Sequence, residues 1–227
     1  MKRSIGAIFM AVGIALSGYF IYLGISKYAE KDRCVTVKGL SEREVLANRV
    51  TWPMKVSING NNLDNMRLRV TEMKDTVIAY LKQKKINDAN ITVSALQIDD
   101  RWEYNEVNTK KERYNVSIDI TVTSDDVPLI LSIMKNQTEF LKKGVCLTSK
   151  DYGIKYEYTD LAKLKPSMVE EATKNAHAVA EKFAEDANCE IGSIINATQG
   201  QFSIDEEYYR PQYMKIRVVT TVAYYLK

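Results

Sequence analysis

The sequence predicts an α+β fold in which antiparallel sheets are covered by helices, with a transmembrane helix in front. Three observations lead to this fold class. Several segments alternate apolar and polar residues with a period of two, as half-buried strands do, and longer segments place apolar residues three and four apart, as helices do. The segments follow the order strand–helix–strand–strand–helix and then strand–helix–strand–strand, a degenerate duplication of one βαββ unit. The 227 residues are enough to bury a sizeable core.

The N-terminal segment predicts a membrane anchor. Residues Ile5–Ile25 carry no charge, and these 21 residues in a helix would cross a hydrocarbon core of roughly 30 Å. Tyr19 and Tyr22 lie toward the far end, where aromatic rings favour the membrane interface. We therefore expect residues 1–4 in the cytoplasm, an anchor over 5–25 and a juxtamembrane linker over 26–34.

A cleaved signal peptide is the alternative interpretation, with "ALS" before Gly18 resembling a cleavage site. Cleavage there would leave the apolar stretch "GYFIYLGI" at the mature terminus, which favours the uncleaved anchor. A very short basic N-terminus, here Lys2 and Arg3, usually stays inside. The sequence thus predicts a single-pass protein of the cell inner membrane whose C-terminal body lies on the periplasmic or extracytoplasmic side.

The first part of the body reads as two strands and a helix. Val35–Leu40 is a short strand, and apolar residues of one parity from Leu46 to Ile58 predict a long half-buried strand. Pro53 inside that strand suggests an edge or a bulge, and "NGNN" at Asn59–Asn62 is a turn. A helix follows whose buried stripe comprises Leu63, Met66, Val70, Met73, Val77 and Leu81.

The middle of the body predicts a hairpin and a second helix. Ile91–Trp102 is a strand whose inward parity switches near Ala95, consistent with a bulge, and "YNVSIDITVT" from Tyr114 alternates without a break. Ser124 or Asp125 is expected to cap the next helix, which has Pro128 in its first turn and ends at Gly144.

The last part repeats the strand–helix–hairpin order. "GIKYEY" at 153–158 alternates, and Pro166 is expected to open a long helix. Ile194–Ile204 and Tyr213–Leu226 form the predicted final hairpin around "DEEYYRPQ". The inward residues expected for the long helix are Val169, Ala172, Ala176, Val179, Phe183 and Ala187.

Charge and residue types exclude several classes of function. Without Lys2 and Arg3 the chain has 30 basic and 29 acidic residues, so no electrostatic footprint for nucleic acid is present. Three cysteines have no metal-like spacing; a Cys146–Cys189 bridge and burial of both as small apolar residues stay open. We expect no cofactor and no metal site.

Candidate catalytic residues are weak. His177 is the sole histidine, and no serine or cysteine at a useful spacing forms a nucleophile–base pair with it. Asp99 and Asp100 are adjacent in a strand, so they point to opposite faces and cannot share a proton as a catalytic pair would. The sequence therefore predicts a protein that is not an enzyme.

The tips of the two predicted hairpins form a possible interaction surface. They place aromatic side chains among charged residues, a composition typical of protein–protein contact cores. Ordinary solvated turns are the alternative interpretation. The residues of this predicted surface are Trp102, Tyr104, Tyr208, Tyr209 and Arg210.

Four segments of the body carry a family resemblance. Val35, Val37 and Gly39 form an opening V-x-V-x-G, followed by Leu40 and Ser41. The other three are "LKQKKINDANITVSALQI", the strand from Tyr114 and the alanine-spaced helix "EEATKNAHAVAEKFAEDANCEIGSI". In these segments the body resembles the SIMPL domain family, which contains bacterial periplasmic immunogenic and oxidative-stress-defence proteins, although Leu40 and Ser41 replace its commoner G-E pair. The resemblance covers roughly 35–227, which we expect to form one SIMPL domain of two lobes, 35–150 and 151–227.

The resemblance implies an envelope location, a tendency to self-associate and no family active site. We therefore expect a non-enzymatic assembly or interaction module linked to envelope or oxidative stress, in contact with the inner membrane and forming a homo-oligomer. Two alternatives remain: a membrane-tethered hydrolase or small-ligand-binding protein, and an accessory subunit of a membrane complex.

Overall fold

The computed structural model describes residues 12–25, 33–102, 112–148 and 153–227. Contacts divide the chain into two units. The first takes the chain up to Glu44, Ala162–Asp205 and Lys215–Lys227; the second takes Val45–Leu161 and Glu206–Met214. This division differs from two consecutive lobes at 35–150 and 151–227, because the first and last strands of the body each contribute residues to both units.

The described part of the N-terminal segment is a helix over residues 12–25. Among the described residues, no helix is both long enough and apolar enough to cross a membrane. The predicted anchor over 5–25 begins in residues that lie outside the described ones.

The second unit contains a six-stranded sheet. Its central strands β2 (Arg49–Gly60) and β5 (Tyr114–Ser124) pair antiparallel over their full common length, from Val50↔Ser124 to Gly60↔Tyr114. On one side β3 (Ile91–Val93) and β4 (Gln97–Asp100) pair with β5; on the other β6 (Leu147–Thr148) and β7 (Lys155–Glu157) pair with β2. The predicted α+β class with antiparallel sheets is confirmed.

One face of this sheet is apolar and the other polar, as the period-two pattern predicts. Trp52, Met54 and Val56 are fully buried, and their cross-strand partners on β5 are also apolar. On the opposite face Thr51 and Thr123 approach through their hydroxyls at 3.3 Å. The parity of β2 therefore decides which face receives the helices.

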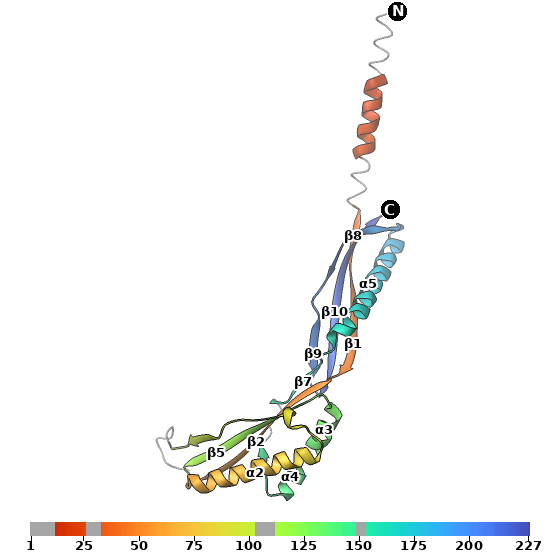
Figure 1. The fold of residues 1–227 in the computed structure, drawn as a ribbon. Coiled ribbons are helices and arrows are strands. Elements are labelled where there is room, and N and C mark those ends of the chain that lie inside the picture. The colour runs from red at the N-terminus through yellow and green to blue at the C-terminus, as the bar shows by residue number, and fades with distance from the viewer. Residues whose placement is uncertain (1–11, 26–32, 103–111, 149–152) are drawn as a thin grey trace, which may run out of the picture. The chain divides into compact units, whose positions relative to one another are not determined.

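The helices of the second unit pack on the apolar face. In Figure 1, α2 (Leu63–Gln83) runs along β2 and β5. The Asn62 side chain caps α2 by accepting a hydrogen bond from the backbone N–H of Asn65 at 3.0 Å. α3 (Val127–Lys135) and the short α4 (Thr138–Lys142) follow β5. The buried residues of α2 include Met66, Val70, Val77 and Leu81, as predicted, and also Tyr80.

Several predicted boundaries of the second unit are wrong for local reasons. Leu46 ends β1 rather than beginning the long strand, because Asn48 turns the chain and its side chain accepts from the Thr159 backbone at 2.8 Å. Asp126, not Ser124 or Asp125, caps α3, since its carboxylate accepts from the backbone N–H of Leu129. Asp125 instead pairs with Arg49.

Pro53 and Ala95 occupy interruptions of the sheet. Pro53 lies in a central strand, but between the stretches of β2 that pair with β7 and with β6, where no backbone donor is needed. Near Ala95 the predicted bulge is confirmed: the register with β5 slips by one residue between Val93↔Ile120 and Gln97↔Ser117.

The remaining four strands form a second sheet, most of which lies in the first unit. Here β1 (Cys34–Leu46) and β8 (Ile191–Gln199) flank β10 (Arg210–Leu226), and β9 (Ser203–Glu207) pairs with another part of β10. The long helix α5 (Leu161–Asp186) lies along this sheet (Figure 1). The helix begins before Pro166, not at it as predicted.

Close packing of α5 on β1 depends on Gly39. A Cβ atom at Gly39 would lie 1.8 Å from the carbonyl oxygen of Ala172 and 2.4 Å from the backbone nitrogen of Ala176. The buried side of α5 consists of small side chains four residues apart, because nothing larger fits at this distance. Apart from Met168, its buried residues are Ala172, Ala176, Ala180 and Ala184.

Because α5 lies so close to β1, part of the inward-facing stripe predicted for this helix is wrong. Val179 and Phe183 were expected to face inward, yet they are exposed by 40% and 58%. The buried alanines of α5, which we call the alanine row, contact the sheet. Val179 and Phe183 therefore lie on a side of the helix that faces away from the sheet.

Candidate interaction surface

Tyr208 and Tyr209 form the two-residue turn between β9 and β10. They are the most exposed large hydrophobic residues of the described chain, at 88% and 89%. Their rings contact each other edge to face, with centroids 5.0 Å apart. The turn therefore presents two adjacent aromatic rings to solvent.

Arg210, the third predicted residue of this tip, lies on the strand beside the turn. Its guanidinium lies over the ring of Tyr213, 4.8 Å from the centroid, and pairs with the carboxylate of Glu207. The Arg210 side chain is therefore held by contacts within its own hairpin, whereas the rings of Tyr208 and Tyr209 are exposed to solvent. We call Tyr208 and Tyr209 the tyrosine turn.

Trp102 belongs to a different hairpin, between β4 and β5. The Arg113 guanidinium lies 5.5 Å from its ring and 4.9 Å from the ring of Tyr114. Arg113 also pairs with Asp100, whose Oδ2 accepts hydrogen bonds from Nε at 2.9 Å and from Nη2 at 2.7 Å. That hydrogen-bonded pair lowers the pKa of Asp100. Trp102, exposed by 37%, is therefore partly covered, and Tyr104 lies outside the described residues.

The weak catalytic candidates lie in ordinary surroundings. His177 is half exposed on α5, its Nδ1 3.5 Å from Glu181 and its ring edge to face with Tyr224. Asp99 is exposed, whereas Asp100 is held by Arg113. In the part of the chain that the structure describes, no three His, Cys, Asp or Glu side chains gather as a metal site would require. All three cysteines are free.

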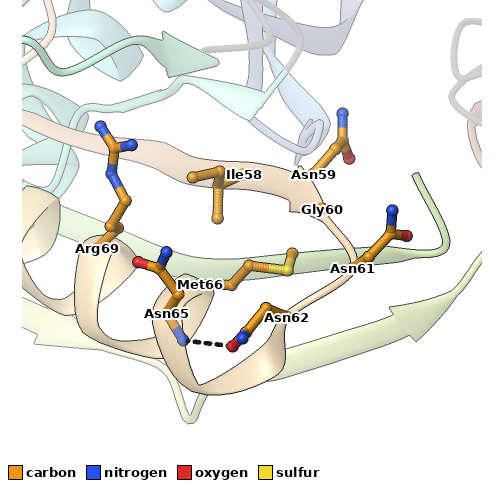
Figure 2. Close-up of a pocket in the computed structure, with 8 residues that line it drawn as sticks. All are labelled: Ile58, Asn59, Gly60, Asn61, Asn62, Asn65, Met66 and Arg69. Atoms are coloured by element: carbon orange, nitrogen blue, oxygen red, sulfur yellow. Dashed lines mark hydrogen bonds between the residues drawn. The ribbon is translucent and has the colours of Figure 1, made fainter. Parts of the chain in front are cut away.

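A shallow pocket of about 220 Å³ opens where β2 turns into α2. Figure 2 shows the Met66 side chain reaching toward Gly60 and the cap between Asn62 and Asn65. Its amides are used within the fold: Asn59 accepts from Asn115, and Asn61 accepts from the backbone N–H of Arg113, both at 2.8 Å. The asparagines of "NGNN" thus build the turn, as the sequence predicts.

A second, larger pocket lies beside Tyr80, at the end of α2 and against α4. No motif in the sequence predicted this pocket. Its residues come from positions about sixty apart in the chain, and only the packing of α4 against α2 brings them together. The only sequence signal is a lysine directly after each helix, Lys84 and Lys143.

Comparison with known proteins gives one family. The model of the family described as "SIMPL: Protein of unknown function (DUF541)" matches residues 35–223. No curated protein matches the chain.

Proposed function

The chain belongs to the SIMPL family, and from this premise we propose that it is a membrane-anchored, non-enzymatic protein of the bacterial cell envelope. It acts as an assembly or interaction module in envelope or oxidative stress, and it forms homo-oligomers. The tyrosine turn is the observation that carries this proposal.

Two bare aromatic rings on a hairpin tip suit contact with another protein. Tyrosine is enriched at interface centres because it offers a large contact area with few rotatable bonds. Nothing in the described chain covers Tyr208 or Tyr209, so their apolar area is available to a partner.

The anchor and the location rest on the N-terminal sequence. The uncharged stretch Ile5–Ile25 is long enough to span, and the basic residues before it favour a cytoplasmic N-terminus. Tethering every copy to one membrane raises its local concentration, so a weak contact between two turns becomes populated.

The non-enzymatic part of the proposal rests on His177. Its described contacts are a carboxylate and an aromatic ring rather than a serine or cysteine that a histidine could activate.

Sedimentation velocity of the full chain in mild detergent, with chemical crosslinking, tests the assembly. Tyr208→Ser with Tyr209→Ser should shift the chain toward monomer without changing its circular dichroism. Leu68→Ser with Leu141→Ser is the matched control, since it removes two exposed apolar side chains elsewhere and should leave assembly intact. A monomeric unmodified chain at high concentration, or equal loss of assembly in the control, contradicts the proposal.

A further inference from the structure

The pocket beside Tyr80 collects polar groups from two helix ends of the second unit. It has a volume of about 600 Å³, within the range of small-molecule sites. It is lined by Tyr80, Gln83, Lys84, Asn136, Glu139 and Lys143.

Two lysines approach the same aromatic ring. The ammonium nitrogens of Lys84 and Lys143 lie 5.5 and 5.8 Å from the centroid of the Tyr80 ring. Because both distances end at the same centroid, the separation of the two ammonium groups cannot exceed the sum of the two distances. Among the described residues, neither lysine forms a salt bridge.

The one carboxylate of the pocket does not neutralise them. Glu139 accepts a hydrogen bond of 2.7 Å from Lys142, which lies outside the lining. This pair is the main reason that the pKa of Glu139 is lowered, and Lys84 and Lys143 add to the effect from a longer distance. With Glu139 matched by Lys142, the pocket keeps the two positive charges of Lys84 and Lys143.

The hydroxyl of Tyr80 takes no part in this arrangement. Only 4% of this residue is exposed, and its buried hydroxyl has no hydrogen-bond partner among the described residues. Buried hydroxyls are nearly always hydrogen-bonded in proteins. This hydroxyl is closed to solvent, so a ligand in the pocket would meet the Tyr80 ring and the two lysines rather than the hydroxyl oxygen.

Helix ends explain only part of the arrangement. Lys84 and Lys143 directly follow α2 and α4, where a cation is favourable to the helix dipole. That effect accounts for one lysine at each end. It does not account for their convergence on one ring.

We propose that this pocket binds a phosphate group, carried either by a small soluble molecule or by a lipid headgroup. A phosphate monoester carries a charge of about −1.5 to −2 at neutral pH, which matches the two unpaired lysines, and lysine is a common phosphate ligand. The pocket is larger than a phosphate. Gln83 and Asn136 place carboxamides where the attached polar group would lie.

Titration of the full chain in mild detergent by calorimetry tests this site, at constant ionic strength with chloride as the background anion. Glycerol 3-phosphate and a soluble phosphatidic acid with six-carbon chains, both phosphate monoesters, are the two probes, and the tighter binder identifies the source of the phosphate. Lys84→Gln and Lys143→Gln should each weaken binding of that probe about tenfold, the usual effect of losing one charged hydrogen bond.

Two further variants separate binding from folding. Lys135→Gln, an exposed lysine outside the pocket, is the matched control and should bind as the unmodified chain does. Tyr80→Phe keeps the ring that the two lysines approach, so it should retain binding, with the melting temperature unchanged or raised because the hydroxyl has no partner to lose. Absence of binding by both probes, or equal weakening in Lys135→Gln, overturns the proposal.

Discussion

Gly39→Ala is expected to be among the most destabilising single-methyl additions in the chain. The new Cβ would overlap backbone atoms of α5, at 1.8 Å from the Ala172 oxygen, and no side-chain rotation relieves such an overlap. The helix would have to move by more than 1 Å to reach an ordinary contact of about 3 Å or more.

That movement loosens the alanine row, whose members Ala172, Ala176 and Ala180 are fully buried against the sheet. Overpacking of this kind costs typically 1–3 kcal/mol, and a clash with backbone places Gly39→Ala near the upper end, at about 3 kcal/mol. For a chain of this size that corresponds to a decrease in melting temperature of roughly 6–12 °C.

Thermal unfolding followed by circular dichroism measures the effect, with Gly60→Ala as the control. At Gly60 the new Cβ would meet only the flexible side chain of Met66, with the sulfur at 3.1 Å, so a much smaller loss is expected. Hydrogen exchange should show that the loss at Gly39 is concentrated in α5 and β1. An unchanged melting temperature for Gly39→Ala would refute the close-packing argument.

Two other predictions concern the second unit and the N-terminus. Because the ion pair with Arg113 lowers the pKa of Asp100, its stabilisation is complete above the unfolded value of about 3.9 and is lost as pH falls through the lower folded pKa. Asp100→Asn should therefore destabilise the protein at pH 7 in urea unfolding, and the difference should shrink below about pH 4; a difference that is constant with pH would contradict the assignment. For the anchor, we expect the full chain to stay in the membrane pellet after carbonate washing, whereas release of a chain beginning at Gly18 would show a cleaved signal peptide.

The pattern of the sequence was sufficient for the buried faces of the second unit's central strands. Alternation over Val50–Ile58 and Tyr114–Val122 predicts which face of each strand is buried, because period two admits only one assignment of faces. Only the structure shows that these two strands pair with each other. The parity switch near Ala95 likewise locates the bulge, since one added residue exchanges the faces.

The sequence did not predict correctly which face of α5 in the first unit is buried. Val179 and Phe183 are larger and more apolar than the alanines of α5, so hydrophobicity alone places them inward. The helix instead turns alanines toward Gly39, because the distance between β1 and α5 decides what fits. That distance belongs to two segments more than a hundred residues apart.

By itself, the sequence determined the family, the α+β class, the strand parities and the exposed tyrosine turn, because each depends on residues that are neighbours in the chain. Only the tertiary structure decided which face of α5 is buried, which aromatic tip is covered by an arginine, and that Lys84 and Lys143 share the ring of Tyr80. Each of these depends on distances between segments that are far apart in the chain, and a local pattern does not encode such distances.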